Sequence, residues 1–200
     1  MELHINKISK SYGSLTILHD VTMTLRQDTC YCLMSPSGSG KTTLLRILMG
    51  LEHPDSGSVT VSSPEKQLVS ISSLKVSAVF QEDRLVSFLS PVENVKLTAG
   101  AFMEPSLIRQ EMKKLLPEEC LDRPVSTLSG GMKRRTAILR AMLTPSELLL
   151  MDEPFTGLDE EMRRHVIAYI RKMRGQRFLL LTTHQAEEAQ LLNGQIITLS

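Results

Sequence analysis

The residue types best suited to chemistry lie in one short stretch, residues 35–43, with the sequence SPSGSGKTT. Small residues let such a loop curl until successive N–H groups point inward, and a helix after the loop adds the positive end of its dipole. Lys41 can reach the outer phosphates of a nucleoside triphosphate, and the Thr42 hydroxyl is a suitable ligand for Mg²⁺. The residues expected to face the phosphates are Ser37, Gly38, Ser39, Gly40, Lys41, Thr42 and Thr43. The alternative is a Gly/Ser-rich turn that only precedes a helix.

The first residue of this loop departs from the usual pattern G-x-x-x-x-G-K-[ST], because Ser35 stands where the first glycine is expected. A positive φ at this position would strain a serine, whereas an extended backbone would accept it. We expect the extended conformation.

Two acidic residues follow a continuous apolar run at 147–151. Such a run is typical of a strand that is covered on both faces in a parallel sheet. At the end of this strand, Asp152 is suited to hold Mg²⁺ and Glu153 to polarise an attacking water. The alternative is that the two acids open a solvated loop. A second apolar run, 178–181, leads to His184, which we expect to touch a γ-phosphate rather than to be an ordinary surface histidine.

Two further features are weaker when considered alone. Tyr12 lies beside glycine at a predicted turn, where it either stacks on a nucleotide base or is a turn or core residue. Ser129, Gly130 and Gly131 open a predicted helix, and their N–H groups and hydroxyl suit either an anion or an ordinary N-cap. From the residues alone, the N-cap is favoured.

Hydrophobic periodicity places these residues on alternating elements. We expect two strands within residues 2–25, strands at 58–62, 76–80, 147–151, 178–181 and 196–199, and helices after residue 43, from 91, over 107–116, over 137–142 and over 160–173. One domain, residues 1–200, is expected. It would consist of a core at 1–81 and 144–200, with a helical subdomain inserted at 82–143.

Composition limits the possible partners. A net charge of +1 without a long basic run argues against nucleic acid, and the cluster at 133–135 (KRR) is interpreted as a solvated helix face. Three cysteines favour a reducing compartment, with Cys30 and Cys32 as core thiols. Because no apolar run approaches the roughly 20 residues that cross a bilayer, we expect a chain that is soluble and reaches the membrane only through a partner.

Together, in this order, these features closely resemble an ATP-binding cassette (ABC) ATPase, the subunit that powers membrane transporters. The resemblance covers essentially the whole chain. It implies an α/β fold with a P-loop NTPase core, a mostly parallel sheet, an N-terminal antiparallel β part and an inserted helical subdomain. It also implies that Tyr12 stacks on adenine, that Gln81 is the lid glutamine and a Mg²⁺ ligand, that residues 128–132 are the family signature, and that Asp159 is the D-loop acid.

The resemblance further implies a head-to-tail dimer, either a homodimer or a pseudo-symmetric one. Each ATP would lie between Lys41 of one subunit and Ser129 of the other, with Glu153 activating water, His184 holding the γ-phosphate and Gln81 taking part in catalysis. Transmembrane permease subunits would dock at residues 81–95, a solute-binding protein would act indirectly, and the chain would lie on the inner face of the cell membrane.

The residues of three motifs resemble those of the nitrate, sulfonate and taurine importer branch: VFQED at 79–83, MDEPF at 151–155 and THQAEEA at 183–189. Met132, where glutamine is commoner, fits the same branch. Residues 117–127 are shorter than the family's segment, and the chain ends soon after 196–199.

Two alternatives are a non-transport ABC ATPase and a nucleotide-binding regulatory module without turnover. Against the first, the chain has neither a long coiled-coil insertion nor a second cassette. Against the second, Lys41, Asp152, Glu153 and His184 are all in place. A small GTPase is disfavoured because no N-K-x-D motif is present.

Overall fold

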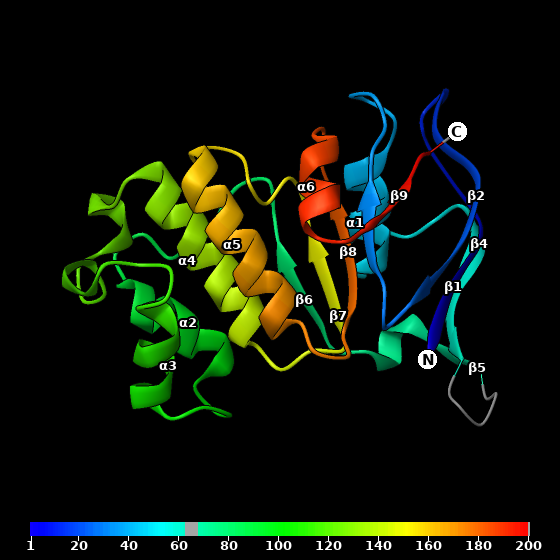
Figure 1. Cartoon of the computed structure of the whole chain (residues 1–200). Coiled ribbons are helices and arrows are strands. Elements are labelled where there is room, and N and C mark those ends of the chain that lie inside the picture. Colours follow the sequence, from blue (N-terminus) through cyan, green and yellow to red (C-terminus); the bar gives the residue numbers. More distant parts are fainter. Residues whose placement is uncertain (63–67, 200) are drawn as a thin grey trace. The chain divides into compact units, whose positions relative to one another are not determined.

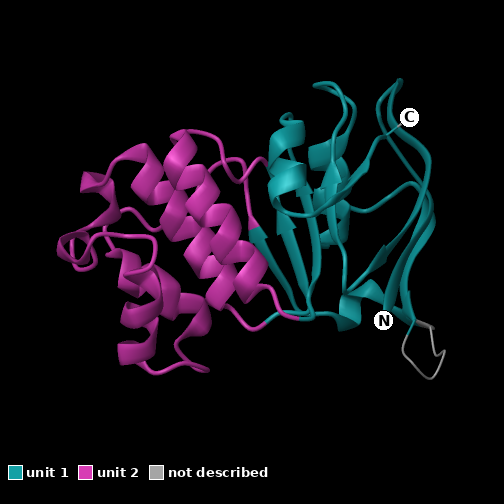
Figure 2. Cartoon of the chain, in the orientation of Figure 1, with its two compact units in different colours: residues 1–78, 146–152, 176–200 teal, residues 79–145, 153–175 magenta. Residues whose placement is uncertain are grey.

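The computed structural model describes residues 1–62 and 68–199. They form two compact units, which Figure 2 colours separately. The first unit comprises residues 1–78, 146–152 and 176–200, and the second comprises 79–145 and 153–175. The second unit thus contains the whole of the predicted helical segment, 82–143, together with a later helix. That residues 82–143 form an inserted subdomain stays a prediction.

An antiparallel sheet forms one part of the first unit, in the order β2 (Leu15–Arg26), β1 (Glu2–Tyr12), β4 (Ser56–Ser62) and β5 (Leu68–Ser70) (Figure 1). Alternating apolar residues direct one face of β1 inward, and Leu3, Ile5 and Ile8 are fully buried. The two predicted N-terminal strands and their connecting turn are present. The short strand β5 has no counterpart among the predicted elements.

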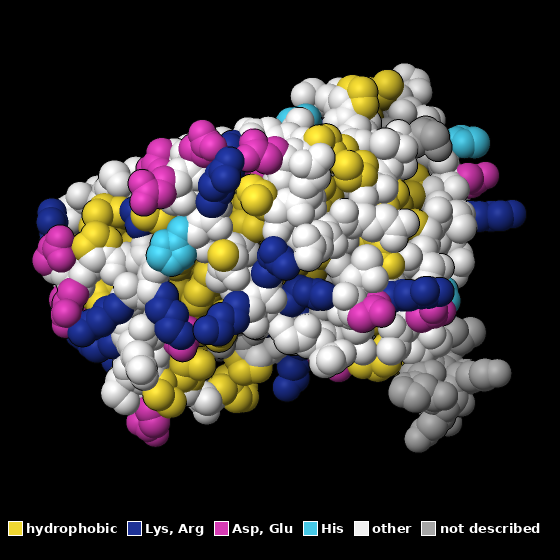
Figure 3. Space-filling model, viewed as in Figure 1, with side chains coloured by type: hydrophobic (Ala, Val, Ile, Leu, Met, Phe, Trp, Pro, Cys, Tyr) yellow, Lys and Arg dark blue, Asp and Glu magenta, His cyan; other side chains and the backbone are white. Residues whose placement is uncertain are grey.

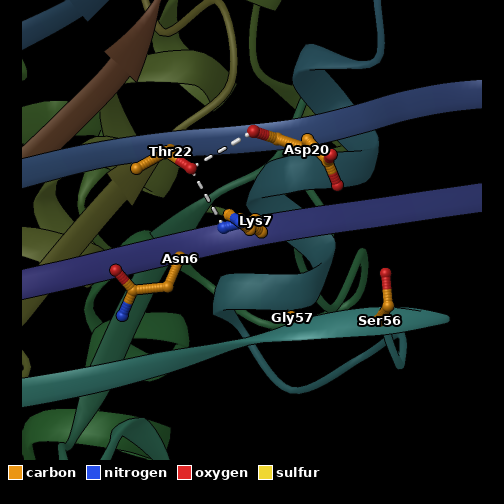
Figure 4. A pocket seen from close by; sticks show the side chains of 6 residues that line it. All are labelled: Asn6, Lys7, Asp20, Thr22, Ser56 and Gly57. Carbon is orange, nitrogen blue, oxygen red and sulfur yellow. Dashed lines mark hydrogen bonds between the residues drawn. The ribbon is translucent and has the colours of Figure 1, made fainter.

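The pairing of β1 with β2 is irregular between Ile5 and Ile8. Lys7 and Asp20 both have positive φ, and the Thr22 hydroxyl accepts a hydrogen bond from Lys7 N at 3.0 Å and donates one to Asp20 O at 3.2 Å (Figure 4). Only glycine fits at position 57, where a Cβ would lie 2.3 Å from Lys7 O. A surface pocket forms here, lined by Asn6, Lys7, Asp20, Thr22, Ser56 and Gly57. None of the predicted site residues lines it.

A second sheet has the order β6 (Val76–Val79), β7 (Leu148–Met151), β8 (Phe178–Thr182), β3 (Cys30–Leu33) and β9 (Gln195–Ile197). The pairs β7–β8, β8–β3 and β3–β9 are parallel, and every residue of β7, β8 and β3 is buried. Continuous apolar runs therefore became doubly covered parallel strands, as predicted. Cys30 and Cys32 are buried and form no disulfide within the described residues, and hydrogen bonding with Cys30 together with burial raises the pKa of the Cys32 thiol. Both are core thiols.

Helices α1 (Lys41–Leu48) and α6 (Ala186–Leu191) also belong to the first unit. Leu44, Leu45 and Leu48 of α1 pack into the same hydrophobic core as β3, β7 and β8. Helix α6 has no counterpart among the predicted elements. A single-turn 3₁₀ helix, η1 (Ile71–Ser73), lies between β5 and β6.

The second unit is helical, with α2 (Pro91–Ala99), α3 (Pro105–Met112), α4 (Gly130–Leu143) and α5 (Glu160–Met173), and single 3₁₀ turns at η2 (Glu118–Cys120) and η3 (Val125–Thr127). Helix α2 begins with a capping box in which Ser90 and Glu93 each accept the other's backbone N–H. The predicted span of α5 is confirmed.

The predicted helix over 107–116 is wrong at its C-terminal end, since α3 ends at Met112. The chain then tightens into turns, with the N–H groups of Leu115 and Leu116 both donating to Met112 O at 3.1 and 2.9 Å. Pro117 explains the stop, because a proline disfavours the helical conformation of the residue before it. Leu115 and Leu116 are nevertheless buried.

Charges are mixed on the molecular surface. On the face drawn in Figure 3, Lys and Arg side chains lie among Asp and Glu side chains, in keeping with the net charge of +1.

Candidate functional site

The predicted phosphate loop connects β3 to the first residue of α1, Lys41. Gly40, the N-cap of α1, has φ +88°, and a Cβ there would lie 2.5 Å from the Leu18 side chain. Any other residue at this position would be both strained and clashing. Since Gly40 has no side chain, α1 begins without a side-chain cap. The N-terminal N–H groups of such a helix are suited to bind an anion.

Lys41 is folded back onto the loop. Its side chain is buried, and Nζ donates to the carbonyl oxygens of Ser35 at 2.7 Å and Pro36 at 3.0 Å. By contrast, the Ser39 hydroxyl is buried without a hydrogen-bond partner among residues 1–62 and 68–199. An orphaned buried donor is costly, and a phosphate oxygen would satisfy it. The loop therefore fits the phosphate groups of a nucleotide.

Ser35, at the position of the first glycine, is not among the residues with positive φ. The expected unstrained backbone is confirmed. Its hydroxyl has a role that the sequence did not suggest, because Ser35 Oγ accepts a hydrogen bond from Leu199 N at 2.7 Å. The residue before it is held in the same way, with Met34 N donating to Ile197 O at 2.8 Å. The start of the loop is thus fastened to β9 and the residues after it.

Asp152 follows β7 and is almost fully buried. Its two oxygens accept hydrogen bonds from the hydroxyls of Thr42 at 2.8 Å and Thr182 at 2.7 Å. The predicted pair of Mg²⁺ ligands, Thr42 and Asp152, is therefore in direct contact, although 110 residues separate them in sequence. Thr182, the last residue of β8, was not predicted, and only its place at a strand end could have suggested it.

His184 lies exposed after β8. The preceding residue, Thr183, is buried, donates to the Glu188 carboxylate and accepts from Gln185 N at 3.0 Å. These bonds tie the segment that carries His184 to α6.

Tyr12 is 48% exposed, so its ring is open to a ligand. Lys10 Nζ lies 5.4 Å from the centroid of this ring and also pairs with Glu52 at 3.1 Å and Asp55 at 3.3 Å. Hydrogen bonding to Lys10 lowers the pKa of Glu52. The pKa of Asp55 is lowered most by a hydrogen bond from the Ser11 N–H and next by a hydrogen bond from Lys10. The segment with Tyr12 is thus pinned to the turn that follows α1.

The signature residues begin α4 in the second unit. Ser129 is its N-cap and accepts a hydrogen bond from Met132 N at 3.3 Å, so the capping interpretation is confirmed. Asp159 caps α5 in the same way, accepting from Met162 N at 2.8 Å. A Cβ on Gly131 would lie 3.5 Å from Gly157 O, which places the signature beside the segment that leads to Asp159.

The basic cluster on α4 corrects a prediction. A solvated face was expected for residues 133–135, but Arg134 is only 4% exposed. Its guanidinium donates to acceptors in two segments, among them Phe80 O, Gln81 O and Asp83 Oδ1 in one and Glu153 O and Pro154 O in the other. Burial is possible because backbone carbonyls and a carboxylate satisfy the charge. The hydrophobic periodicity of the sequence does not indicate such partners.

The predicted site residues are thus divided between the units. Tyr12, residues 37–43, Asp152 and His184 belong to the first, and Gln81, Ser129, Gly130, Gly131, Glu153 and Asp159 to the second. Within the first unit the structure joins Thr42 to Asp152, and within the second Arg134 links the backbones of Gln81 and Glu153. The predicted roles in binding and catalysis stay predictions.

Comparison with known proteins decides the family. A family model described as "ABC transporter" matches residues 18–156. The chain belongs to this family. It is 33% identical to the sulfate/thiosulfate import ATP-binding protein CysA of Synechocystis sp., aligning over 100% of the chain and 58% of that relative. It is 34% identical to the Nod factor export ATP-binding protein I of Cupriavidus pinatubonensis, over 95% of the chain and 61% of the relative.

The fold comparison agrees. The dimeric structure of MJ0796, a bacterial ABC transporter cassette, matches with a TM-score of 0.86 and 24% identity, over 98% of this chain and 94% of that one. A post-hydrolysis state of MJ0796 bound to ADP and Pi matches with a TM-score of 0.84 and the same identity, over 99% and 94%. The predicted resemblance and the P-loop ABC fold are confirmed. This ABC domain spans about three-fifths of the length of the curated relatives. None of its helices within 1–62 and 68–199 has the length and apolar character of a membrane span.

Proposed function

We propose that this ABC domain binds ATP and hydrolyses it to power a membrane transporter. The observation that carries the proposal is the loop of residues 35–43. It combines an uncapped helix start, a buried lysine and an orphaned serine hydroxyl with the contact between Thr42 and Asp152. A Mg²⁺-bound triphosphate requires hydrogen-bond donors that are available to its oxygens, next to a carboxylate that can attract the cation.

Each predicted residue has a separate task in phosphoryl transfer. Lys41 gives up its hydrogen bonds to the loop carbonyls, bonds phosphate oxygens instead and offsets the charge of the phosphates. Glu153 accepts the proton of the attacking water, and His184 donates a hydrogen bond to the γ-phosphate. Thr42 and Asp152 would hold Mg²⁺, with Gln81 as the predicted further ligand, and the ion would neutralise charge on the phosphates. Tyr12 stacks on adenine.

The active form that we propose is a dimer in which Ser129, Gly130 and Gly131 of one subunit, with Asp159 nearby, complete the ATP site of the other. The dimeric MJ0796 cassette supports this arrangement by analogy of fold. Permease subunits would dock at residues 81–95, where Phe88 is 76% exposed. A solute-binding protein would act through the permease, no nucleic acid is involved, and the chain would lie on the cytoplasmic face of the membrane.

We further propose that the transporter is an importer of the nitrate, sulfonate and taurine type. The residues of the motifs at 79–83, 151–155 and 183–189 support this proposal. The curated relatives include a sulfate/thiosulfate importer and a Nod factor exporter, so transport is the shared element of their names. Co-purification of this chain with a permease, followed by uptake and efflux assays, would test the direction and the solute.

Glu153→Gln tests the proposed chemistry. The amide keeps the size of the side chain but cannot accept the proton, so turnover should fall by about 10²-fold or more while ATP binding persists. The ATP-bound dimer should then accumulate, which size-exclusion chromatography at saturating ATP would detect. Unchanged turnover would remove Glu153 from catalysis, and a mutant that stays monomeric would contradict the dimer.

A further inference from the structure

We infer that Arg134 is a positioning residue for ATP hydrolysis, because it holds the backbones of Gln81 and Glu153 in one arrangement. The inference rests on the proposed function, in which these two residues act on ATP. It concerns a residue that the sequence placed on a solvated helix face.

The contacts of Arg134 fall into two sets. Nη1 donates to Phe80 O at 2.6 Å, to Gln81 O at 3.3 Å and to Asp83 Oδ1 at 3.2 Å. Nε donates to Pro154 O at 3.0 Å and Nη2 to Glu153 O at 2.5 Å. One planar group therefore connects two segments that are at least 70 residues apart in sequence. The rigid fork of arginine suits this task, because its donors point in fixed directions.

The backbone of Glu153 needs such support. Glu153 has φ +45°, a conformation that a non-glycine residue adopts only at a cost. Strained residues of this kind persist where their surroundings fix them, and they concentrate at functional sites. The acceptors of Arg134 include the carbonyl oxygens of Glu153 and of the next residue, Pro154. Arg134 thus holds the peptide groups on the C-terminal side of the strained residue.

The two segments are connected to the signature through α4. Arg134 lies five residues after Ser129, the N-cap of the same helix. Neither Ser129 nor a residue of the phosphate loop is among the acceptors named above. Loss of the guanidinium should therefore disturb the carboxylate that activates water and leave the residues that hold ATP in place. A displacement of about 1 Å at a reacting group can lower a rate by roughly 10²-fold.

The test uses two variants of the whole chain. Arg134→Met keeps a long apolar stem and removes every donor, and Arg134→Lys keeps the charge but offers one nitrogen, which cannot span both segments. We expect kcat to fall by roughly tenfold to a hundredfold in the methionine variant and less in the lysine variant. The Kd for ATP, measured with a chelator so that the predicted Mg²⁺ ligand Gln81 does not contribute, should change by less than about twofold in both variants.

A double-mutant cycle with Glu153→Gln separates positioning from general damage. If Arg134 acts through Glu153, adding Arg134→Met to Glu153→Gln should lower the residual single-turnover rate by less than about twofold. A full additional tenfold loss in that background would overturn the inference. So would an increase in the Kd for ATP that matches the loss in kcat. If neither Arg134 variant folds, as judged by thermal unfolding, the residue is structural and the inference fails.

Arg140→Gln is the matched control. Arg140 lies on the same helix and donates to Asp83 O at 3.1 Å and Arg84 O at 2.7 Å, but to neither Glu153 nor Pro154. Its substitution should lower kcat by less than about threefold. An equal loss in both variants would show that any disturbance of residues 80–84 has the effect, which would overturn the assignment. Failure of the proposed function would look different, because wild-type turnover would then be absent or insensitive to Glu153→Gln.

Discussion

The phosphate loop of the first unit and the signature helix of the second handle their polar groups in contrasting ways. Among the residues that the structure describes, the Ser39 hydroxyl of the loop has no hydrogen-bond partner, α1 has no side-chain cap, and Lys41 donates to two nearby carbonyls. Along α4, the guanidinium of Arg134 is buried and bonded to backbone carbonyls and a carboxylate of two segments.

The contrast indicates a division of labour. Groups left without partners are available to a ligand, and they set its affinity. Groups that already have partners fix the geometry of the residues around them, and they set the rate of the chemical step. Changes in the loop should therefore act on ATP binding, whereas changes around Arg134 should act on turnover.

The largest effect is expected when the two regions are separated between subunits. Lys41→Ala removes the charge of the loop, and Ser129→Arg blocks the signature with a bulky cation, so each mutant homodimer should have two defective sites. In a mixed dimer, one site would unite the intact loop of the Ser129→Arg subunit with the intact signature of the Lys41→Ala subunit. With Glu153→Gln in both chains to stop turnover, trapped nucleotide should rise to about one ATP per mixed dimer.

The control for this experiment is each parent homodimer, which should trap almost none. A mixture that traps no more than its parents would show that Lys41 and Ser129 act within one chain. The two regions would then belong to one site of one subunit.

Asp152→Asn should have the next largest effect, and only in the presence of Mg²⁺. The amide preserves the size of the side chain and can still bond Thr42 and Thr182, but it removes the charge that attracts the cation. The Kd for ATP with Mg²⁺ should rise by about tenfold, and the Kd measured with a chelator should change little. Calorimetry under both conditions would show this.

Thr182→Val is the matched control for Asp152→Asn. It deletes one of the two hydrogen bonds to Asp152 and leaves the charge in place. We expect a loss of about 1 kcal/mol in the free energy of unfolding with a smaller change in affinity. If valine weakened Mg²⁺-dependent binding as much as asparagine does, the position of the carboxylate rather than its charge would be decisive.

Sequence reasoning succeeded where the determining signals are local. The apolar runs of β7 and β8, the span of α5 and the start of α2 follow from periodicity and from a proline at the first helical position. The phosphate loop was predicted because its glycines and lysine must be adjacent in sequence to act together. The absence of a positive φ at Ser35 followed from reasoning about which residues tolerate that conformation.

Apart from the pairing of Thr42 with Asp152, contacts between distant segments could not be predicted in this way. The order of the parallel sheet places β3 between β8 and β9, which no local pattern encodes. The acceptors of Arg134 are mostly backbone carbonyls, which every residue type carries, so sequence cannot reveal them. Charge alone suggested a solvated face, and the burial of Arg134 depends on 80–83 and 153–154 folding around it.

Ser35 offers a smaller test within the loop. Ser35→Ala removes the hydrogen bond from Leu199 N and should cost about 1 kcal/mol in the free energy of unfolding. Ser35→Gly removes the same bond and also adds freedom to the unfolded chain, so its loss should be greater by up to about 1 kcal/mol. Chemical denaturation of both variants would measure the contribution of the hydrogen bond and the added freedom of the unfolded chain separately.

The outcome at Ser35 bears on the loop itself. Because the backbone at Ser35 is not in the positive-φ region, glycine has no strain to relieve. A clear gain in ATP affinity in the glycine variant would contradict the unstrained backbone. Equal stability of the serine and alanine forms would show that the bond to Leu199 contributes nothing in solution.

The smallest effect is expected at Tyr12, at the rim of the first region. Tyr12→Ala should weaken ATP binding by about 1 kcal/mol through lost stacking, with little discrimination between adenine and guanine, because every base presents a π-face. Tyr12→Phe should be nearly silent. The phenylalanine variant keeps the ring. Glu52 loses the hydrogen bond that it accepts from the Tyr12 hydroxyl, but it still pairs with Lys10 at 3.1 Å. Fluorescent-nucleotide titration of both variants would measure the difference. A large loss of affinity in the phenylalanine variant would mean that the hydroxyl, and not the ring, holds the nucleotide.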